Sequence, residues 1–197
     1  WIALLIEINK YRKSRKSIYM IVKYFLILTL IFIIGCVQQQ ENQIQTTEVI
    51  NMKLTSSAFQ NNGVVPSEYT CDGSDLSPQL SISDVPSNAK SLVLISDDPD
   101  APVGTWDHWV VFNIAAATKE IPKGTEPKGI AGRNSWGRTG YGGPCPPSGT
   151  HRYFFRLYAL DTELNLPEGS TKKDLERAME GHIIAQAQLM GIYKRSK

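Results

Sequence analysis

The segment SDDPDAPVGTWDHWVVFNI, residues 96–114, concentrates acidic side chains beside one histidine. Two prolines stiffen its acidic part, because proline fixes its own φ and favours extended geometry in the residue before it. The segment therefore holds carboxylates in fixed positions a few residues from an imidazole. The carboxylates are those of Asp97, Asp98, Asp100 and Asp107, and the imidazole is that of His108.

Apolar runs flank this segment on both sides. Residues 92–95 form one run, and residues 108–114, rich in aromatic and β-branched side chains, form the other. Both runs are typical of β-strands. We expect Asp98 and Asp100 at the rim of a sheet and His108 at the start of the next strand. Loops on a rigid scaffold often carry function, so this rim is the first candidate site.

A second segment, GRTGYGGPCPPSGTHRY at residues 137–153, supplies a flexible partner for the first. Its five glycines allow the backbone to approach a ligand closely. Its backbone N–H groups could form an anion-binding nest. The alternation of a strand then places His151, Tyr153, Phe155 and Leu157 on one face.

The spacing of apolar runs and turn residues predicts a mainly β fold. Expected strands cover residues 52–59, 79–82, 91–96, 108–114 and 151–160, separated by turns at 61–66, 85–88 and 122–132. No helical periodicity precedes residue 170, which favours an antiparallel β-sandwich over β-α-β units. A capping box of Thr171 and Asp174 begins a helix that ends near Gly181. A second short helix is expected at 182–189, and a last strand near Ile192.

Charge is distributed unevenly along the 197 residues. Residues 1–36 contain six basic residues and one acidic residue, whereas residues 37–197 carry 15 Lys and Arg against 18 Asp and Glu. The later part is therefore mildly acidic and shows no basic patch, which argues against nucleic acid as a partner. Residues 52–197 are enough for one domain with a sizeable core.

The first 36 residues have the pattern of an export signal. Met20 opens an apolar run that ends Ile-Ile-Gly-Cys at Cys36, as in a lipobox whose cysteine becomes the lipid-modified N-terminus. Residues 1–19 fit translation upstream of the true start. The alternative is a membrane-spanning anchor, but the apolar run is shorter than the roughly 20 residues a span needs. Either interpretation places the domain outside the cytoplasm, on a polar tether at 37–51.

Two further cysteines, Cys71 and Cys145, lie in loops. An extracytoplasmic location permits a disulfide between them. Two separate thiols are the equal alternative, because sequence does not give the Cα–Cα distance.

Several motifs in order resemble the phosphatidylethanolamine-binding protein family, in its bacterial and archaeal Raf-kinase-inhibitor-like subgroup. They are YTCDG at 69–73, DPDAP at 98–102 followed by the strand with Trp106 and His108, GRTGYGGPCPP at 137–147, HRY at 151–153, and EGHIIAQAQLMGIYKR at 180–195. The resemblance covers residues 52–195 and implies a β-sandwich with a metal-free pocket for a phospholipid head group or small anion. It also implies that some members act as kinase or serine-protease inhibitors.

The resemblance assigns the pocket residue by residue. By their motifs, Asp98, His108, His151 and Tyr153 match residues that line it, and Asp100, Pro102 and Pro146 match supporting positions. A carboxylate beside the imidazoles is expected to raise their pKa values and make them charged donors to an anion. Trp109 faces away from His108 and belongs to the core or outer sheet. Arg152 and Arg156 face away from His151 as paired surface charges.

Metal and hydrolase sites are weaker alternatives. Asp98, Asp100, His108 and His151 are acceptable metal ligands by type, but no HxH or HxxxH spacing is present. The chain also lacks a GxSxG elbow around Ser135 or Ser148. A thiol pair of Cys145 with His151 has no support beyond their nearness in sequence.

The sequence therefore predicts a membrane-anchored, non-enzymatic protein that binds an anion or phospholipid head group without cofactor or metal. The alternative is a protein-interaction module that inhibits a kinase or a serine protease. An inhibitor of the second kind needs a rigid exposed loop, for which residues 122–132 are the candidate.

Overall fold

The computed structural model describes residues 52–195. The predicted export signal, Cys36 and the tether at 37–51 lie outside this range. No helix within residues 52–195 is long and apolar enough to cross a membrane.

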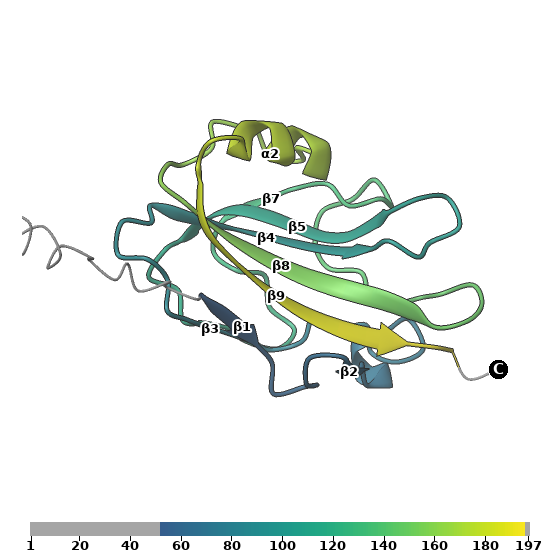
Figure 1. The fold of residues 1–197 in the computed structure, drawn as a ribbon. Helices are drawn as coiled ribbons and strands as arrows, with labels where there is room; N and C mark the ends of the chain where they lie inside the picture. Colours follow the sequence, from purple (N-terminus) through teal and green to yellow (C-terminus); the bar gives the residue numbers. More distant parts are fainter. Residues whose placement is uncertain (1–51, 196–197) are drawn as a thin grey trace, which may run out of the picture. The chain divides into compact units, whose positions relative to one another are not determined.

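Two sheets form the described domain (Figure 1). The large sheet has the order β2-β9-β8-β4-β5-β7, and the small sheet has the order β1-β3-β6. The strands are β1 (Lys53–Thr55), β2 (Gly63–Val64), β3 (Leu80–Ser83), β4 (Ser91–Asp98), β5 (Trp106–Ala115), β6 (Glu120–Ile121), β7 (Ile130–Ala131), β8 (His151–Leu160) and β9 (Ile183–Tyr193). One 3-10 turn, η1 (Ser67–Tyr69), and one α-helix, α2 (Lys172–Met179), complete the described elements. The predicted β-sandwich class is confirmed.

Strand β4 is the centre of the large sheet. It pairs antiparallel with β5 on one side and with β8 on the other, and all eight of its residues are buried. A strand covered on both faces needs a continuous apolar run, which residues 92–95 supply. Its two terminal aspartates, Asp97 and Asp98, are therefore carried to the end of a rigid element.

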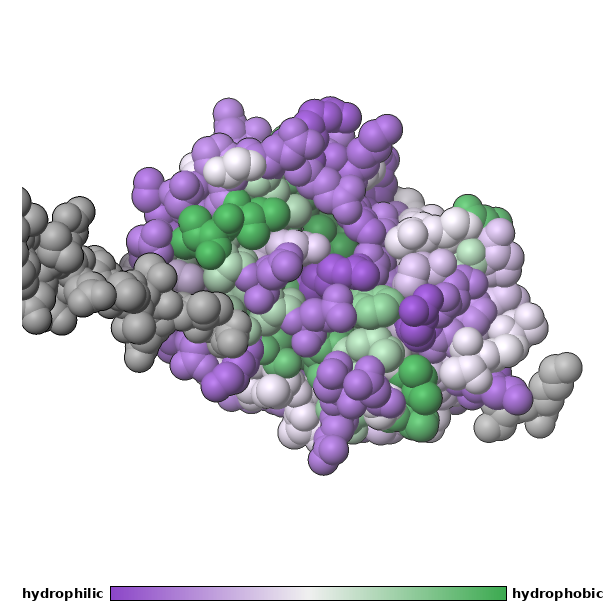
Figure 2. All heavy atoms as spheres, in the orientation of Figure 1, coloured by the Kyte–Doolittle hydropathy of each residue, from purple (hydrophilic) through white to green (hydrophobic). Residues whose placement is uncertain are grey.

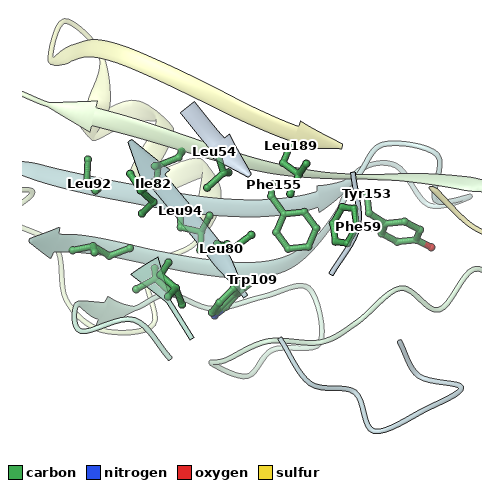
Figure 3. Close-up of a cluster of buried hydrophobic side chains, with 14 of the residues drawn as sticks. Leu54, Phe59, Leu80, Ile82, Leu92, Leu94, Trp109, Tyr153, Phe155 and Leu189 are labelled. Carbon is green, nitrogen blue, oxygen red and sulfur yellow. The ribbon is translucent and has the colours of Figure 1, made fainter. Parts of the chain in front are cut away.

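The larger core fills the space between the two sheets. Leu54 and Ile82 of the small sheet belong to one cluster with Trp109 and Phe155 of the large sheet (Figure 3). Trp109 is fully buried there, so of the core and the outer sheet it belongs to the core. Burial of such side chains stabilises each by roughly 1.5–3 kcal/mol relative to exposure. The predicted orientation opposite His108 is wrong: an irregularity in the β4–β5 pairing leaves His108 as an extra residue between Asp107 and Trp109, so both rings lie on the same side of the sheet.

Helix α2 covers the other face of the large sheet (Figure 1). Leu175 and Met179 pack on a second cluster that includes Val93 and Phe112. The predicted capping box is present: the Thr171 side chain accepts from the Asp174 backbone N–H, and the Asp174 carboxylate accepts from that of Thr171. The cap fixes where the helix begins and so where Lys172 lies.

The helix predicted at 182–189 is wrong. Residues 183–189 belong to β9, which pairs with β8 from Ile183 opposite Leu160 to Tyr193 opposite His151. The strand predicted near Ile192 is the end of this longer one. Pairing with a distant strand overrides the local helix propensity of alanine, glutamine and leucine.

The observed bounds of β4 and β5 also place Asp98 and His108 differently from the prediction. Strand β4 extends through Asp98, which pairs with Trp106, and β5 begins two residues before His108. The carboxylate and the imidazole therefore lie within the ladder rather than in the loop. Strands β2, β6 and β7 have two residues each, and they lie within or next to the segments that were predicted as turns.

Candidate ligand pocket

Asp98 and His151 form a buried pair at the end of β4 and β8. His151 Nδ1 lies 2.7 Å from Asp98 Oδ2, and the two side chains are 8% and 5% exposed. The other carboxylate oxygen accepts from the Asp100 backbone N–H at 2.8 Å. Because the ionised carboxylate accepts, His151 Nδ1 carries the proton of this bond and Nε2 is the nitrogen left for another partner.

His108 contacts a carbonyl and not a carboxylate. Its Nδ1 lies 2.6 Å from the carbonyl oxygen of Gly142, which can only accept, so Nδ1 carries the proton. Burial lowers the pKa of His108, although the Gly142 bond and Asp98 oppose this effect. The predicted rise in its pKa is therefore wrong. His108 offers a neutral Nε2 acceptor instead of a charged donor.

Tyr153 brings an unpaired hydroxyl to the same place. Its ring meets that of His108 edge to face at 5.3 Å and lies nearly parallel to that of His151 at 6.4 Å. Burial, and then the nearby Asp98 carboxylate, raise the pKa of this hydroxyl. Asp98 and the backbone of Cys145 lie near enough to influence this pKa, but neither forms a hydrogen bond with the hydroxyl. Among residues 52–195, no other buried side-chain polar atom lacks a partner.

Figure 3 shows the direction of this hydroxyl. The Tyr153 ring lies at the edge of the core cluster and its oxygen points away from the aliphatic side chains. A buried polar atom without a partner is uncommon in native proteins and calls for a physical explanation.

A cavity of about 440 Å³ opens beside these residues. Three of the predicted site residues line it, namely Asp98, Pro102 and His108. His151 and Tyr153 lie behind the wall, each in contact with a lining side chain. Pro146 is buried between Cys145 and Pro147, which both line the cavity.

Sequence reasoning missed several lining residues. Trp136, Arg138 and Asp75 line the cavity together with Trp106. The Trp136 ring meets those of Trp106 and His108 edge to face at 5.4 and 5.0 Å. The Arg138 guanidinium lies 5.7 Å from the Trp136 ring centroid. The only sequence signal for Trp136 and Arg138 was their place at the start of the glycine-rich loop.

The glycine-rich loop forms the wall opposite β4. A Cβ on Gly142 would come within 2.5 Å of the Trp136 ring, and one on Gly143 within 2.4 Å of the Tyr69 carbonyl. These glycines are needed for close approach. Their N–H groups donate to the His108 carbonyl and to Asp75 Oδ1, so neither is free for an anion. Residues 142 and 143 therefore do not provide the predicted nest.

Cys71 and Cys145 are joined by a disulfide with a Cα–Cα distance of 5.4 Å. Both line the cavity. The Cys71 N–H also donates to the carbonyl of Pro144 at 3.2 Å. The disulfide thus holds the loop after η1 against the glycine-rich loop.

Asp100 serves as a clamp beside the site. The Arg152 guanidinium donates to both of its carboxylate oxygens, at 2.9 and 2.7 Å, and the Arg152 backbone N–H donates as well. These bonds lower the pKa of Asp100 to about 2. The pairing predicted for Arg152 is present, and it joins the β4–β5 loop to the start of β8.

Asp97, one residue before Asp98, faces the opposite side of the sheet. Its side chain is 2% exposed and pairs with both Arg156 and Lys172. Lys172 also lies 3.5 Å from Asp107. Burial opposes the charge of Lys172, but the two carboxylates outweigh it and raise its pKa. Burial, in contrast, raises the pKa of Asp107.

Other chemistry finds little support at this site. No group of three or more His, Cys, Asp or Glu is arranged to hold a metal ion within the described part of the chain. The Ser135 hydroxyl accepts from the Asp107 backbone N–H at 2.8 Å. Cys145 is in the disulfide, so a thiol pair with His151 is excluded in this state.

The family model for phosphatidylethanolamine-binding proteins matches residues 55–194. The chain belongs to the phosphatidylethanolamine-binding protein family. Relatives in this family include a UPF0098 protein of Methanothermobacter thermautotrophicus, 53% identical over 150 residues, covering 73% of this chain and 99% of that protein. A UPF0098 protein of Pyrococcus horikoshii is 50% identical over 158 residues, covering 75% of this chain and 79% of that protein.

Crystal structures of the phosphatidylethanolamine-binding protein family share the fold. The homologue CT736 from Chlamydia trachomatis is 47% identical, with a TM-score of 0.73 over 75% of this chain and 99% of that one. Escherichia coli YbcL is 30% identical, with a TM-score of 0.69 over 74% of this chain and 99% of that one.

Proposed function

We propose that the cavity beside Asp98 and His108 binds a small phosphate-bearing molecule of the phospholipid head-group type. The Tyr153 hydroxyl carries this proposal. It is buried, it has no partner within the described residues, and it lies next to two residues of the cavity wall. Leaving a buried hydroxyl unpaired costs about 1–3 kcal/mol. A ligand that accepts its hydrogen bond would recover part of that cost.

Arg138 supplies the positive charge for such a ligand. Its guanidinium stays charged at all accessible pH values and offers a fork of donors that matches phosphate geometry. It lines the cavity and makes no ion pair with a carboxylate among residues 52–195. Arg138 thus takes the role that the sequence had assigned to a charged His108.

The carboxylates and the aromatic rings complete the proposed specificity. Asp98 is engaged by His151, and one oxygen of Asp75 is engaged by Gly143. The remaining acceptors, with neutral His108 and two tryptophans, suit a ligand that also carries donors or a cationic group. We propose binding without catalysis, since the candidate nucleophiles Ser135 and Cys145 are already engaged.

We further propose that the domain is tethered outside the cytoplasm through a lipidated Cys36. The sequence before residue 37 motivates this, and the disulfide supports it, because Cys71 is exposed and such bonds persist in oxidising compartments. Expression from Met20 with labelled fatty acid tests the anchor. Equal labelling of the parent and Cys36→Ser would contradict it.

Titration with glycerophosphoethanolamine and with inorganic phosphate tests the pocket. The parent is expected to bind, and His151→Ala is expected to lose about 1.5–3 kcal/mol if Nε2 donates to a charged group in a dry site. His182→Ala is the matched control, since His182 pairs with Asp161 and is 47% exposed away from the cavity lining. Equal affinity of parent and His151→Ala would remove His151 from the site, and affinity lost on adding a chelator would favour a metal.

One observation favours the second candidate, a serine-protease inhibitor. The loop at 122–132 is largely exposed, yet it is held in place at several points. Glu126 accepts from the Trp109 indole and the Tyr141 N–H, and the Gly124 N–H donates to Ser77. A rigid exposed loop carrying Lys128 fits a trypsin-like protease. Inhibition that is lost in Lys128→Ala would support this candidate, and no inhibition by the parent would end it.

A further inference from the structure

Strand β9 forms the outer border of the large sheet along most of its length. It pairs with β8 on one side, and on the other side only with β2, at Gly191 and Ile192. In Figure 1, β2 lies near the arrowhead of β9, and no other strand from residues 52–195 pairs along this edge. Strand β1 packs on the inner side through Leu54 and Leu189 but pairs with β3. An open sheet edge is a place where another extended chain can pair.

The backbone groups that face this edge can be identified from Met190. Its N–H donates to Asn61 Oδ1 at 2.9 Å, and its carbonyl accepts from the Asn62 N–H at 2.7 Å, so both groups point away from β8. Backbone direction alternates along an antiparallel strand, so the N–H and carbonyl groups of Gln188 and Gln186 face the same way. Among the described residues, no strand or turn hydrogen bond engages these groups.

The edge also lacks the features that usually prevent pairing. Exposed edges are commonly protected by charged residues, prolines or bulges. Strand β9 reads IIAQAQLMGIY, without a charge or a proline, and its one irregularity lies at its start, opposite Ala159 and Leu160. Figure 2 shows hydrophobic surface where β9 begins, at the upper left of the view, and Ile183 is 44% exposed there. The open part of β9 thus keeps its capacity to pair.

A second cavity, of about 480 Å³, lies on the outer face of the sheet beside this open edge. The Arg156 guanidinium lies 4.6 Å from the Phe154 ring centroid and pairs with Asp97 through Nη1, which leaves its other N–H groups as donors. The lining holds this one cation and no carboxylate, so an acidic side chain complements it. The lining residues are Arg156, Tyr158, Gln186, Ala187 and Gln188.

We propose that the open edge of β9 pairs with an extended acidic segment of a partner protein, and that one of its carboxylates enters the cavity beside Arg156. Main-chain bonds to Gln186 and Gln188 supply affinity, and the cavity supplies selectivity. The added strand lies about 5 Å from β9, and every second side chain of it lies on the cavity face. This face is opposite the ligand pocket, so the inference does not depend on the proposed function.

A second copy of this chain complements the edge less well. Two copies of β9 paired with each other would bring together only uncharged side chains, because β9 contains no acidic residue. Neither Arg156 would then meet a carboxylate of the other β9. Charge complementarity therefore favours an acidic strand from a different protein.

Hydrogen exchange and peptide titration in the full chain, held in detergent micelles, test the proposal. The probes are short acetylated peptides of alternating valine and threonine that differ only in a central glutamate, glutamine or lysine. Gln188→Pro removes one outward N–H and leaves the β8–β9 ladder in place, since proline is tolerated where the N–H faces away from the sheet. Gln188→Thr is the matched control, because it keeps the N–H and favours a strand.

The glutamate peptide is expected to slow exchange at the Gln186 and Gln188 amides of the parent, a result that needs no substitution. It should bind about tenfold more tightly than the glutamine peptide, because its bond to Arg156 is charge-assisted, and the lysine peptide should bind most weakly. Gln188→Pro should lose about tenfold or more in affinity, and Gln188→Thr should bind like the parent.

Several outcomes would overturn the proposal. One is no binding of the glutamate peptide, and another is equal affinity in the parent and Gln188→Pro. A lysine peptide that binds as tightly as the glutamate peptide would contradict an acidic partner. Slow exchange at Gln186 and Gln188 that depends on protein concentration, without any peptide, would assign the edge to a second copy of this chain.

Discussion

Asp97 and Asp98 are neighbours at the end of β4, yet their side chains lie on opposite faces of the sheet and have different partners. Asp97 lies under α2, where Arg156 and Lys172 compensate its charge. Asp98 faces the cavity, where its partner is His151 and where the nearby Tyr153 hydroxyl has no partner among residues 52–195. On the face under α2 the buried charges are paired with one another. On the cavity face, polar groups remain available to a ligand.

This difference separates stability from binding. A buried charge network that is fully paired fixes structure, because removing one member leaves the others uncompensated. A buried polar group without a partner adds nothing to stability in the free protein and is available to a ligand. The alternation of a strand thus lets two adjacent aspartates serve two purposes.

The largest effect is expected on the paired face. Lys172→Met leaves the buried Asp97 with Arg156 alone and removes the cation beside the half-buried Asp107, so the free energy of unfolding should fall by about 3 kcal/mol. Urea unfolding followed by tryptophan fluorescence measures it, provided that the m-value stays constant.

Arg177→Met on the same helix is the control for this prediction. Its guanidinium lies 3.9 Å from Asp174 and its side chain is 69% exposed, so no measurable change is expected. If Lys172→Met were as stable as Arg177→Met, the network under α2 would contribute nothing and the contrast between the two faces would fail.

A smaller, pH-dependent effect is expected at His108. Its folded pKa is lowered by burial, so between that value and the ordinary 6.5 the unfolded chain binds more protons than the folded one. Stability is therefore fully present above 6.5 and declines as the pH falls toward the folded pKa. His108→Asn keeps a donor for Gly142 but does not titrate.

Unfolding free energies from about pH 7.5 to about pH 5 measure the effect of His108. The parent should lose more stability than His108→Asn over this range. Identical losses in both proteins would show that His108 is not held neutral.

The smallest effect is expected at the partly exposed clamp of Asp100 and Arg152. Because the folded pKa of Asp100 is about 2, its contribution is present above 3.8 and is lost as the pH falls toward 2. Asp100→Asn should therefore unfold more easily than the parent near neutral pH, and this difference should shrink in acid. A difference that does not change with pH would mean that the ion pair is not its cause.

Helices and strands could be predicted from the sequence where the local residue pattern matches the burial of the side chains in the fold. The apolar run of β4, the alternation of β8 and the capping box of α2 each have a local physical cause. The motifs grouped Asp98 and His151 in one pocket, but that these two side chains pair with each other came only from the structure. The helix predicted at 182–189 failed because β9 gains its stability from β8, and no local pattern records that pairing.

The missed parts of the site depend on tertiary packing. Trp136 and Arg138 lie in a loop without periodicity, whose path is set by the disulfide and by close glycine contacts. The state of His108 was misjudged because nearness to aspartate in sequence gave no information on burial. Its imidazole contacts the Gly142 carbonyl, and the carboxylate of Asp98 contacts His151.

The claim that the open face binds a ligand through unpaired polar groups is tested most directly by Tyr153→Phe. This variant removes one oxygen from a buried site where it has no partner within residues 52–195. Affinity for glycerophosphoethanolamine is measured together with the free energy of unfolding in the absence of ligand. We predict that affinity falls by about 1 kcal/mol while stability does not fall. Unchanged affinity, or a loss of stability as large as the loss of affinity, would contradict the account.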